Sequence, residues 1–214
     1  MNLLGGINMK YEWKKHDKQY YLPKTTPTII DIPSFKYITI EGKGNPNSDQ
    51  FGRVVEALYS LSYAIRMMPK KGFTPEGYFE YTVFPLEGIW DLDEEGRKLE
   101  YLDKDKLVYK LMIRQPGFVT DEVFEKAKEL SNKKISSELL NQATFESIEE
   151  GKCVQCMHLG SYDDEPITFS MMESFCTENN IMRIEKTHRE IYISDARKTP
   201  PEKLKTVIRF KVSN

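Results

Sequence analysis

The sequence has few cysteines, little net charge and no long apolar run, and each shortage excludes a class of protein. Its 214 residues include three cysteines, a low and odd number that favours a reducing compartment over a disulfide framework. The 31 basic and 33 acidic residues leave a net charge of -2, with both signs mixed along the chain. We therefore expect no direct nucleic-acid partner, which would need a basic face. No apolar run reaches the roughly 18–20 residues of a membrane-spanning helix, so we expect no membrane partner.

The opening stretch, residues 1–9, is too short for a secretory signal and lacks its basic segment. Together with the cysteine count, this predicts a cytoplasmic protein. A chain of this length can bury a sizeable core, as one domain or as two small halves.

The residues that usually hold metals are scattered. Cys153 and Cys156 form a C-x-x-C pattern, but they lie at the start of a predicted strand, where residues three apart point to opposite faces. His16, His158 and His188 do not have zinc-site spacing. We therefore predict no metal and no cofactor.

The chain contains an internal repeat. A strand at residues 35–40 leads into a glycine loop at 42–46 and then a helix, whose apolar residues Phe51 to Met68 recur at helical spacing and which ends at Pro69 and Gly72. Strand signals return at residues 78–84 and 107–113.

The second half has the same order of elements. A strand at residues 154–159 precedes a glycine loop at 160–166, a helix with Phe169, Met172, Phe175 and Cys176 on one stripe, and strands at 188–194 and 204–212. We therefore predict a single α+β domain over residues 1–214. It would comprise βαββ modules at about 32–116 and 152–212, joined by a helical stretch at about 120–149. Such a duplication leaves a ligand cleft along its pseudo-twofold axis.

The strand at residues 188–194 carries a carboxylate of interest. Alternation places His188, Glu190 and Tyr192 on one face and Arg189 and Ile191 on the other. On a desolvated pocket wall, Glu190 would gain basicity and could act as a general base or meet a cationic ligand. The same alternation is also typical of a solvated sheet face.

Aromatic residues are numerous, with 12 tyrosines and 2 tryptophans. Several gather between Tyr78 and Trp90, and Glu87 lies beside a glycine near that tryptophan. Such residues could stack on a flat ligand, and tyrosine hydroxyls could donate hydrogen bonds to it. They are equally typical of sheet core or of surface covers.

Several segments resemble the GyrI-like (DNA gyrase inhibitor-like) small-molecule-binding superfamily. The specific ones are C-terminal: GSY at residues 160–162, REIYISD at 189–195 and PPEKLKTVIR at 200–209. The first half is similar to the stand-alone branch of that family in GKGNP at 42–46, LY at 58–59, FPLEGIW at 84–90 and MIRQP at 112–116. The likeness covers most of the chain from about Ile32 onward.

The resemblance implies paired βαββ modules around a cleft with Glu190 at its floor, where hydrophobic, often cationic, aromatic ligands bind. It also implies, through the stand-alone branch, hydrolysis of the cyclopropane ring of DNA-alkylating natural products. We expect Glu190 to activate water, with Tyr192 or Tyr109 polarising the substrate carbonyl. Ligand contacts are expected from five residues: Trp90, Tyr81, Glu87, Tyr109 and Tyr162.

Two other functions use the same features. One is a non-enzymatic module that binds or sequesters drugs and is linked to transcription regulation. The other is inhibition of gyrase by protein contact. The chain has no helix-turn-helix segment and no basic reading face, which argues against direct control of transcription.

Overall fold

The computed structural model describes residues 10–213. Residues 1–9, for which the sequence predicts no secretory signal, lie outside the described residues. The strands are β1 Thr28–Ile32, β2 Phe35–Lys43, β3 Leu86–Leu92, β4 Leu107–Gln115, β5 Thr144–Ile148, β6 Gly151–Leu159, β7 His188–Tyr192 and β8 Lys205–Lys211. The α-helices are α1 Trp13–His16, α2 Lys18–Tyr21, α3 Asp49–Met67, α4 Asp121–Ser131, α5 Ser137–Gln142 and α6 Glu165–Glu178. Short 3-10 turns lie at Met68–Lys71, Gly96–Lys98, Lys104–Lys106, Tyr162–Asp164 and Pro201–Lys203.

The strands form one antiparallel sheet in the order β1-β6-β8-β7-β3-β4-β2-β5. The series β2-α3-β3-β4 and β6-α6-β7-β8 are the two βαββ modules, which confirms the predicted α+β duplication. The modules meet where β3 pairs with β7, and Gly88 lies directly opposite Glu190 there. The pseudo-twofold axis therefore passes between these two residues.

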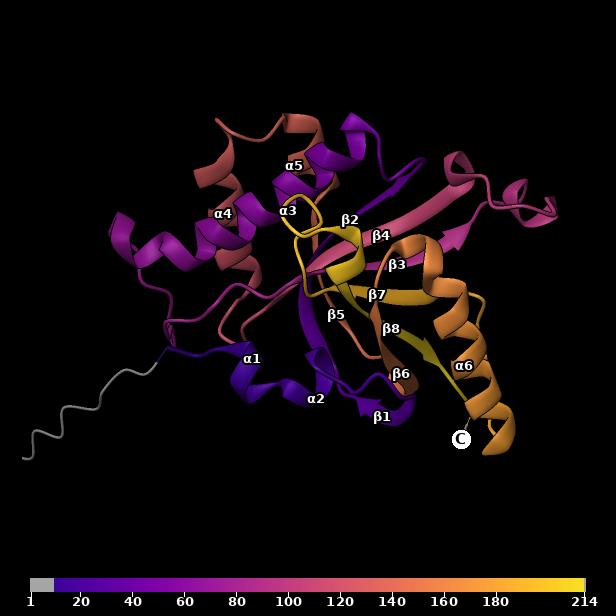
Figure 1. Ribbon diagram of the computed structural model, residues 1–214. Coiled ribbons are helices and arrows are strands. Elements are labelled where there is room, and N and C mark those ends of the chain that lie inside the picture. Colours follow the sequence, from indigo (N-terminus) through magenta and orange to yellow (C-terminus); the bar gives the residue numbers. More distant parts are fainter. Residues whose placement is uncertain (1–9, 214) are drawn as a thin grey trace, which may run out of the picture.

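Each module also sends a strand to the outer edge of the other. β1 precedes β2 but pairs with β6, while β5 precedes β6 but pairs with β2. The β1–β6 and β2–β5 pairings share one antiparallel register, which runs from Thr28 opposite Gln155 to Thr39 opposite Thr144. This exchange curls the sheet into a half-barrel (Figure 1).

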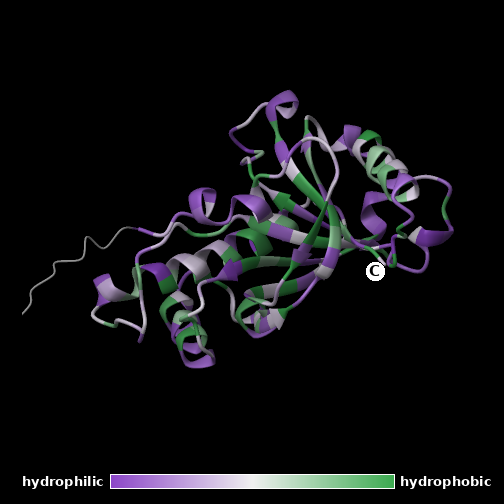
Figure 2. Ribbon diagram, turned by 90° about the horizontal axis from the view of Figure 1, so that it is seen from below, coloured by the Kyte–Doolittle hydropathy of each residue, from purple (hydrophilic) through white to green (hydrophobic). Residues whose placement is uncertain are grey.

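The helices α3 and α6 cover the same face of the sheet, one in each module. Ser48 caps α3 by accepting a hydrogen bond from the backbone N–H of Phe51, and the buried stripe of α3 packs on β2 and β4. Met172 and Cys176 of α6 pack on β6 and β8 in a second apolar cluster. Figure 2 shows apolar residues gathered along the strands and polar ones on the loops.

The N-terminal segment with α1 and α2 lies on the other face of the sheet (Figure 1). Gln155 donates a hydrogen bond to the carbonyl of Gln19, and Arg209 donates one to the carbonyl of Tyr20. These bonds hold the segment against the sheet. Within residues 10–213, no helix combines the length and the apolar character that crossing a bilayer requires.

Two segments differ from the expected elements. Residues 78–84 form no regular strand: Tyr81 makes one isolated bridge to Tyr11, and the strand of this module runs from Leu86 to Leu92. The aromatic side chains of this segment pack against the N-terminal segment and Phe118, and this packing holds the segment in place without strand pairing. Residues 120–149 contain two helices and also the strand β5.

Candidate functional site

The candidate site lies on the face under α3 and α6, where β3 meets β7. Glu190 shares that face with His188 and Tyr192, as the alternation predicts. Trp90 is paired with His188, so it projects to the same side. Phe51 of α3 stacks on Trp90 with ring centroids 5.8 Å apart, and Phe169 of α6 meets the ring of His188.

A chain of hydrogen bonds holds the Glu190 carboxylate. The indole N–H of Trp90 donates to the Tyr192 hydroxyl over 2.8 Å, and that hydroxyl donates to Oε2 of Glu190 over 2.8 Å. Nε2 of His188 lies 2.9 Å from Oε1. Glu190 is only 8% exposed. Each carboxylate oxygen therefore has a partner, which fixes the orientation of the carboxylate.

Burial, reinforced by the charge of Glu190, holds the pKa of Tyr192 well above its ordinary value. Its phenol therefore stays protonated and serves as the donor to Glu190. Tyr162 is affected in the same way: burial and the Glu190 charge raise the pKa of Tyr162 to about 12. The site thus keeps neutral tyrosines beside the buried Glu190.

Aromatic rings surround this acid. Tyr109 lies 5.4 Å from Trp90 between ring centroids, and Tyr162 meets the ring of Tyr192 edge-on at 6.1 Å. Two glycines leave the space these rings need. A Cβ at Gly42 would lie 2.5 Å from the Tyr109 ring, and one at Gly88 would lie 2.8 Å from Nε1 of Trp90.

The two modules contribute different chemistry to the site. Gly88 and Glu190 occupy equivalent positions about the pseudo-twofold axis, as do Trp90 and Tyr192. At these two positions the first module therefore contributes a glycine and an indole, whereas the second contributes a carboxylate and a phenol. A symmetric pair of buried glutamates at the axis would repel each other, and glycine on one side removes that conflict.

The sequence did not single out Glu165, the first residue of α6, or Phe51. Glu165 is 8% exposed, and its side chain lies within hydrogen-bonding reach of Glu190. Burial, followed by the charge of Glu190, raises the pKa of Glu165 to about 9. In the sequence, an acid beside Pro166 at the start of a helix is typical of a residue that interacts with the helix dipole. Phe51 is one of several apolar residues at helical spacing, and nothing in the sequence distinguishes it from the others.

The structure does not bring Glu87 together with Glu190. Glu87 lies one position from Gly88 and therefore faces the opposite side of the sheet. There it accepts a hydrogen bond of 2.7 Å from Nη1 of Arg189. Glu150 lies 3.1 Å from Nε of Arg189 and 3.0 Å from Nη1 of Arg209, which completes a buried ion cluster.

Tyr81 also lies apart from Glu190. It is 1% exposed and packs against Phe79 and Phe118. Burial raises its pKa far above the ordinary tyrosine value, and its hydroxyl has no hydrogen-bond partner among the described residues. Of the seven predicted site residues, five therefore gather around β3 and β7: Trp90, Tyr109, Tyr162, Glu190 and Tyr192.

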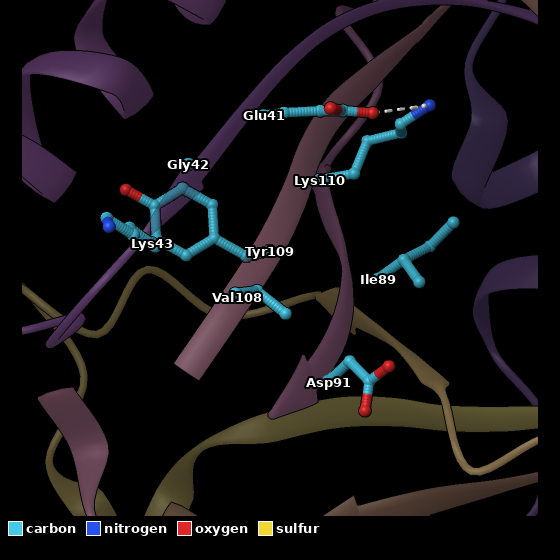
Figure 3. Close-up of a pocket in the computed structure, with 8 residues that line it drawn as sticks. All are labelled: Glu41, Gly42, Lys43, Ile89, Asp91, Val108, Tyr109 and Lys110. Atoms are coloured by element: carbon cyan, nitrogen blue, oxygen red, sulfur yellow. Dashed lines mark ion pairs between the residues drawn. The ribbon is translucent and has the colours of Figure 1, made fainter. Parts of the chain in front are cut away.

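A separate open hollow of about 510 Å³ lies beside Tyr109 (Figure 3). Its wall consists of Glu41, Gly42, Lys43, Ile89, Asp91, Val108, Tyr109 and Lys110. Ile89, Asp91, Val108 and Lys110 alternate with Trp90 and Tyr109 along β3 and β4, so they face the other side of the sheet. Lys110 forms an ion pair of 3.1 Å with Glu41. Among residues 10–213, no group of three or more His, Cys, Asp or Glu side chains is arranged to hold a metal ion.

Comparison with known proteins places these features in one family. The model of the GyrI-like small molecule binding domain matches residues 25–213. An uncharacterized conserved protein from Listeria innocua is 36% identical, with a TM-score of 0.88, and the match covers 95% of this chain and all of the other. A protein of that organism described as a hydrolase is 34% identical, with a TM-score of 0.86 and the same coverage.

A more distant structure, the C-terminal domain of EcmrR, has 14% identity and a TM-score of 0.53, over 88% of this chain and 98% of that one. This likeness extends to the fold alone. No curated protein matches the sequence. The family match spans most of the chain, and the duplicated fold agrees with it: the chain belongs to the GyrI-like small-molecule-binding family.

Proposed function

We propose that this protein binds planar, hydrophobic aromatic compounds at the Glu190 site and hydrolyses the cyclopropane ring of DNA-alkylating natural products. The observation that carries the proposal is the chain from Trp90 through Tyr192 to Glu190, enclosed by aromatic rings. It presents an oriented carboxylate beside surfaces on which a flat ligand can stack. The hydrolase description of the Listeria innocua relative agrees with this reaction class.

In the proposed reaction, Glu190 takes a proton from a water molecule as the water oxygen bonds to a cyclopropane carbon. The ring C–C bond breaks, and its electron pair moves through the conjugated system to the carbonyl oxygen, which ends protonated. Glu190 then releases the proton it took. Overall, the hydroxyl of water ends on the cyclopropane carbon, its proton ends on the former carbonyl oxygen, and the protein is unchanged.

A tyrosine hydroxyl would polarise the carbonyl that receives the electrons. Tyr109 is the better candidate because the Tyr192 proton is already donated to Glu190. Burial raises the pKa of Tyr109, which keeps its phenol protonated as a donor. Ring strain in the substrate lowers the activation barrier, so one general base and one hydrogen-bond donor suffice for catalysis.

The test is incubation of the protein with an alkylator that carries a cyclopropane fused to a conjugated ketone, followed by mass spectrometry. We expect a product heavier than the substrate by one water, formed at a rate proportional to protein concentration. Saturable binding of an unchanged compound would favour the drug-binding module instead. If the compound neither binds nor reacts, the assignment of this site to flat aromatic ligands is wrong.

A further inference from the structure

The second carboxyl of the site, that of Glu165, has no role in the reaction described above. Glu165 belongs to α6, whereas Glu190 belongs to β7, so two elements far apart in the sequence bring the acids together. Oε1 of Glu165 is buried and has no hydrogen-bond partner within residues 10–213. Two ionised carboxylates in contact and shielded from water repel each other strongly.

Other parts of the site keep Glu165 from moving away. His158 is buried, and its ring bridges the Thr168 hydroxyl on α6 and the carbonyl of Ser161, each over 2.8 Å. These contacts fix the start of α6 and the loop before it against β6. The backbone that carries Glu165 is therefore fixed beside the site, and protonation of its carboxyl relieves the repulsion.

Among residues 10–213, no lysine or arginine forms an ion pair with either acid, and the basic side chain that contacts Glu190 is His188. Tyr192 and His188 already bond to Glu190, and Tyr162 is a neutral phenol beside it. Asp163, just before α6, adds a further negative charge, although Lys104 lies 3.5 Å from it at the surface. The surroundings of Glu165 thus favour its neutral form.

We propose that Glu165 and Glu190 form an acid–carboxylate pair, in which Glu165 keeps one proton and donates it as a hydrogen bond to Glu190. Glu165 is then a positioning residue, because it orients the carboxylate that activates water. This role in catalysis rests on the proposed function, whereas the shared proton does not. Loss of that proton places two negative charges together and displaces Glu190 from Tyr192, so activity ends at alkaline pH.

The pair can be tested without any substrate by difference infrared spectroscopy. At pH 7 the protein should show the carbonyl band of an un-ionised carboxylic acid, absent from Glu165→Gln and retained in Glu178→Gln, a change at the exposed end of the same helix. The band should disappear as the pH rises through about 9. In Glu190→Gln it should disappear at a lower pH, since the charge of Glu190 is gone while burial and the charge of Asp163 remain. A wild-type protein without this band at pH 7, or a band that survives in Glu165→Gln, would overturn the pair.

The pH profile of ring opening tests the positioning role. The wild-type rate should fall by about tenfold per pH unit above the ionisation of Glu165. The rate of Glu165→Gln, which keeps an uncharged donor, should stay level over the same range. An unchanged alkaline limit in Glu165→Gln would refute the positioning role even if the infrared band is present. If the wild-type protein opens no ring at all, the proposed function fails, and the infrared result still decides whether the pair exists.

Discussion

The ion cluster behind the site offers a sharp test of how the two modules are joined. Glu87 and Arg189 occupy neighbouring strands of different modules, and their side chains are 1% and 2% exposed. Replacing Glu87 with Gln keeps the size of the side chain but removes its charge. Within residues 10–213, Glu150 is the carboxylate that pairs with both Arg189 and Arg209, so loss of the Glu87 charge leaves the buried cluster with a net positive charge.

Breaking a buried ion pair from one side typically costs about 3–5 kcal/mol, because the remaining charge is left uncompensated. Glu150 still reaches both arginines here, so we expect a loss near the lower end, about 3 kcal/mol. For a chain of this size, that loss lowers the melting temperature by roughly 6–12 °C. The double variant Glu87→Leu with Arg189→Met removes both charges and should recover much of the loss.

The assay is urea and thermal unfolding followed by circular dichroism. A matched control is Glu185→Gln, which removes a surface partner of Lys211 and should change stability by less than about 1 kcal/mol. If Glu87→Gln is as stable as that control, the cluster does not join the modules as described. Ligand binding by folded Glu87→Gln protein also tests the sequence-based expectation that Glu87 contacts a ligand.

Three further predictions concern the site and its pH dependence. Gly88→Ala places a Cβ against the indole of Trp90, so we expect a loss of about 1–3 kcal/mol in thermal unfolding and an altered tryptophan fluorescence spectrum. Trp90→Phe keeps the stacking ring but removes the donor to Tyr192; turnover should fall by about tenfold while the Kd changes little, and an equal change in both would contradict this separation. Burial raises the pKa of Glu150, but the arginine charges outweigh it and leave that pKa below its ordinary value. Glu150 therefore contributes stability that is present above the ordinary carboxyl pKa and is lost as the pH falls through the lower folded value, a loss that Glu150→Gln should not show in acid unfolding.

The sequence predicts the helices and strands of this fold better than it predicts which strands pair with each other. Strand alternation predicts which residues of 188–192 share a face, and helical spacing predicts α3 and α6. The exchange of β1 and β5 between modules has no local signal, because edge pairing depends on distant residues. The aromatic run at residues 78–84 favours a strand by composition, yet its side chains are buried by the N-terminal segment instead.

In the candidate site, too, local sequence predicts some residues, whereas the others depend on contacts between distant parts of the chain. Glu190, Tyr192 and Trp90 could be predicted because the family segments include them. Glu87 was grouped with Trp90 by proximity in the chain, but strand parity turns its side chain to the other face. Glu165 could not be anticipated, since its importance comes from contact with a residue 25 positions away on another element.

Glu190 is proposed to activate water for ring opening, and single-turnover ring opening by Glu190→Gln tests this role most directly. Binding is first matched to the wild-type protein through the change in tryptophan fluorescence, and Glu202→Gln, a change of an exposed glutamate, serves as the control. We predict that Glu190→Gln binds the compound but opens its ring at least about 100-fold more slowly. Ring opening by Glu190→Gln at the wild-type rate would show that Glu190 is not the general base.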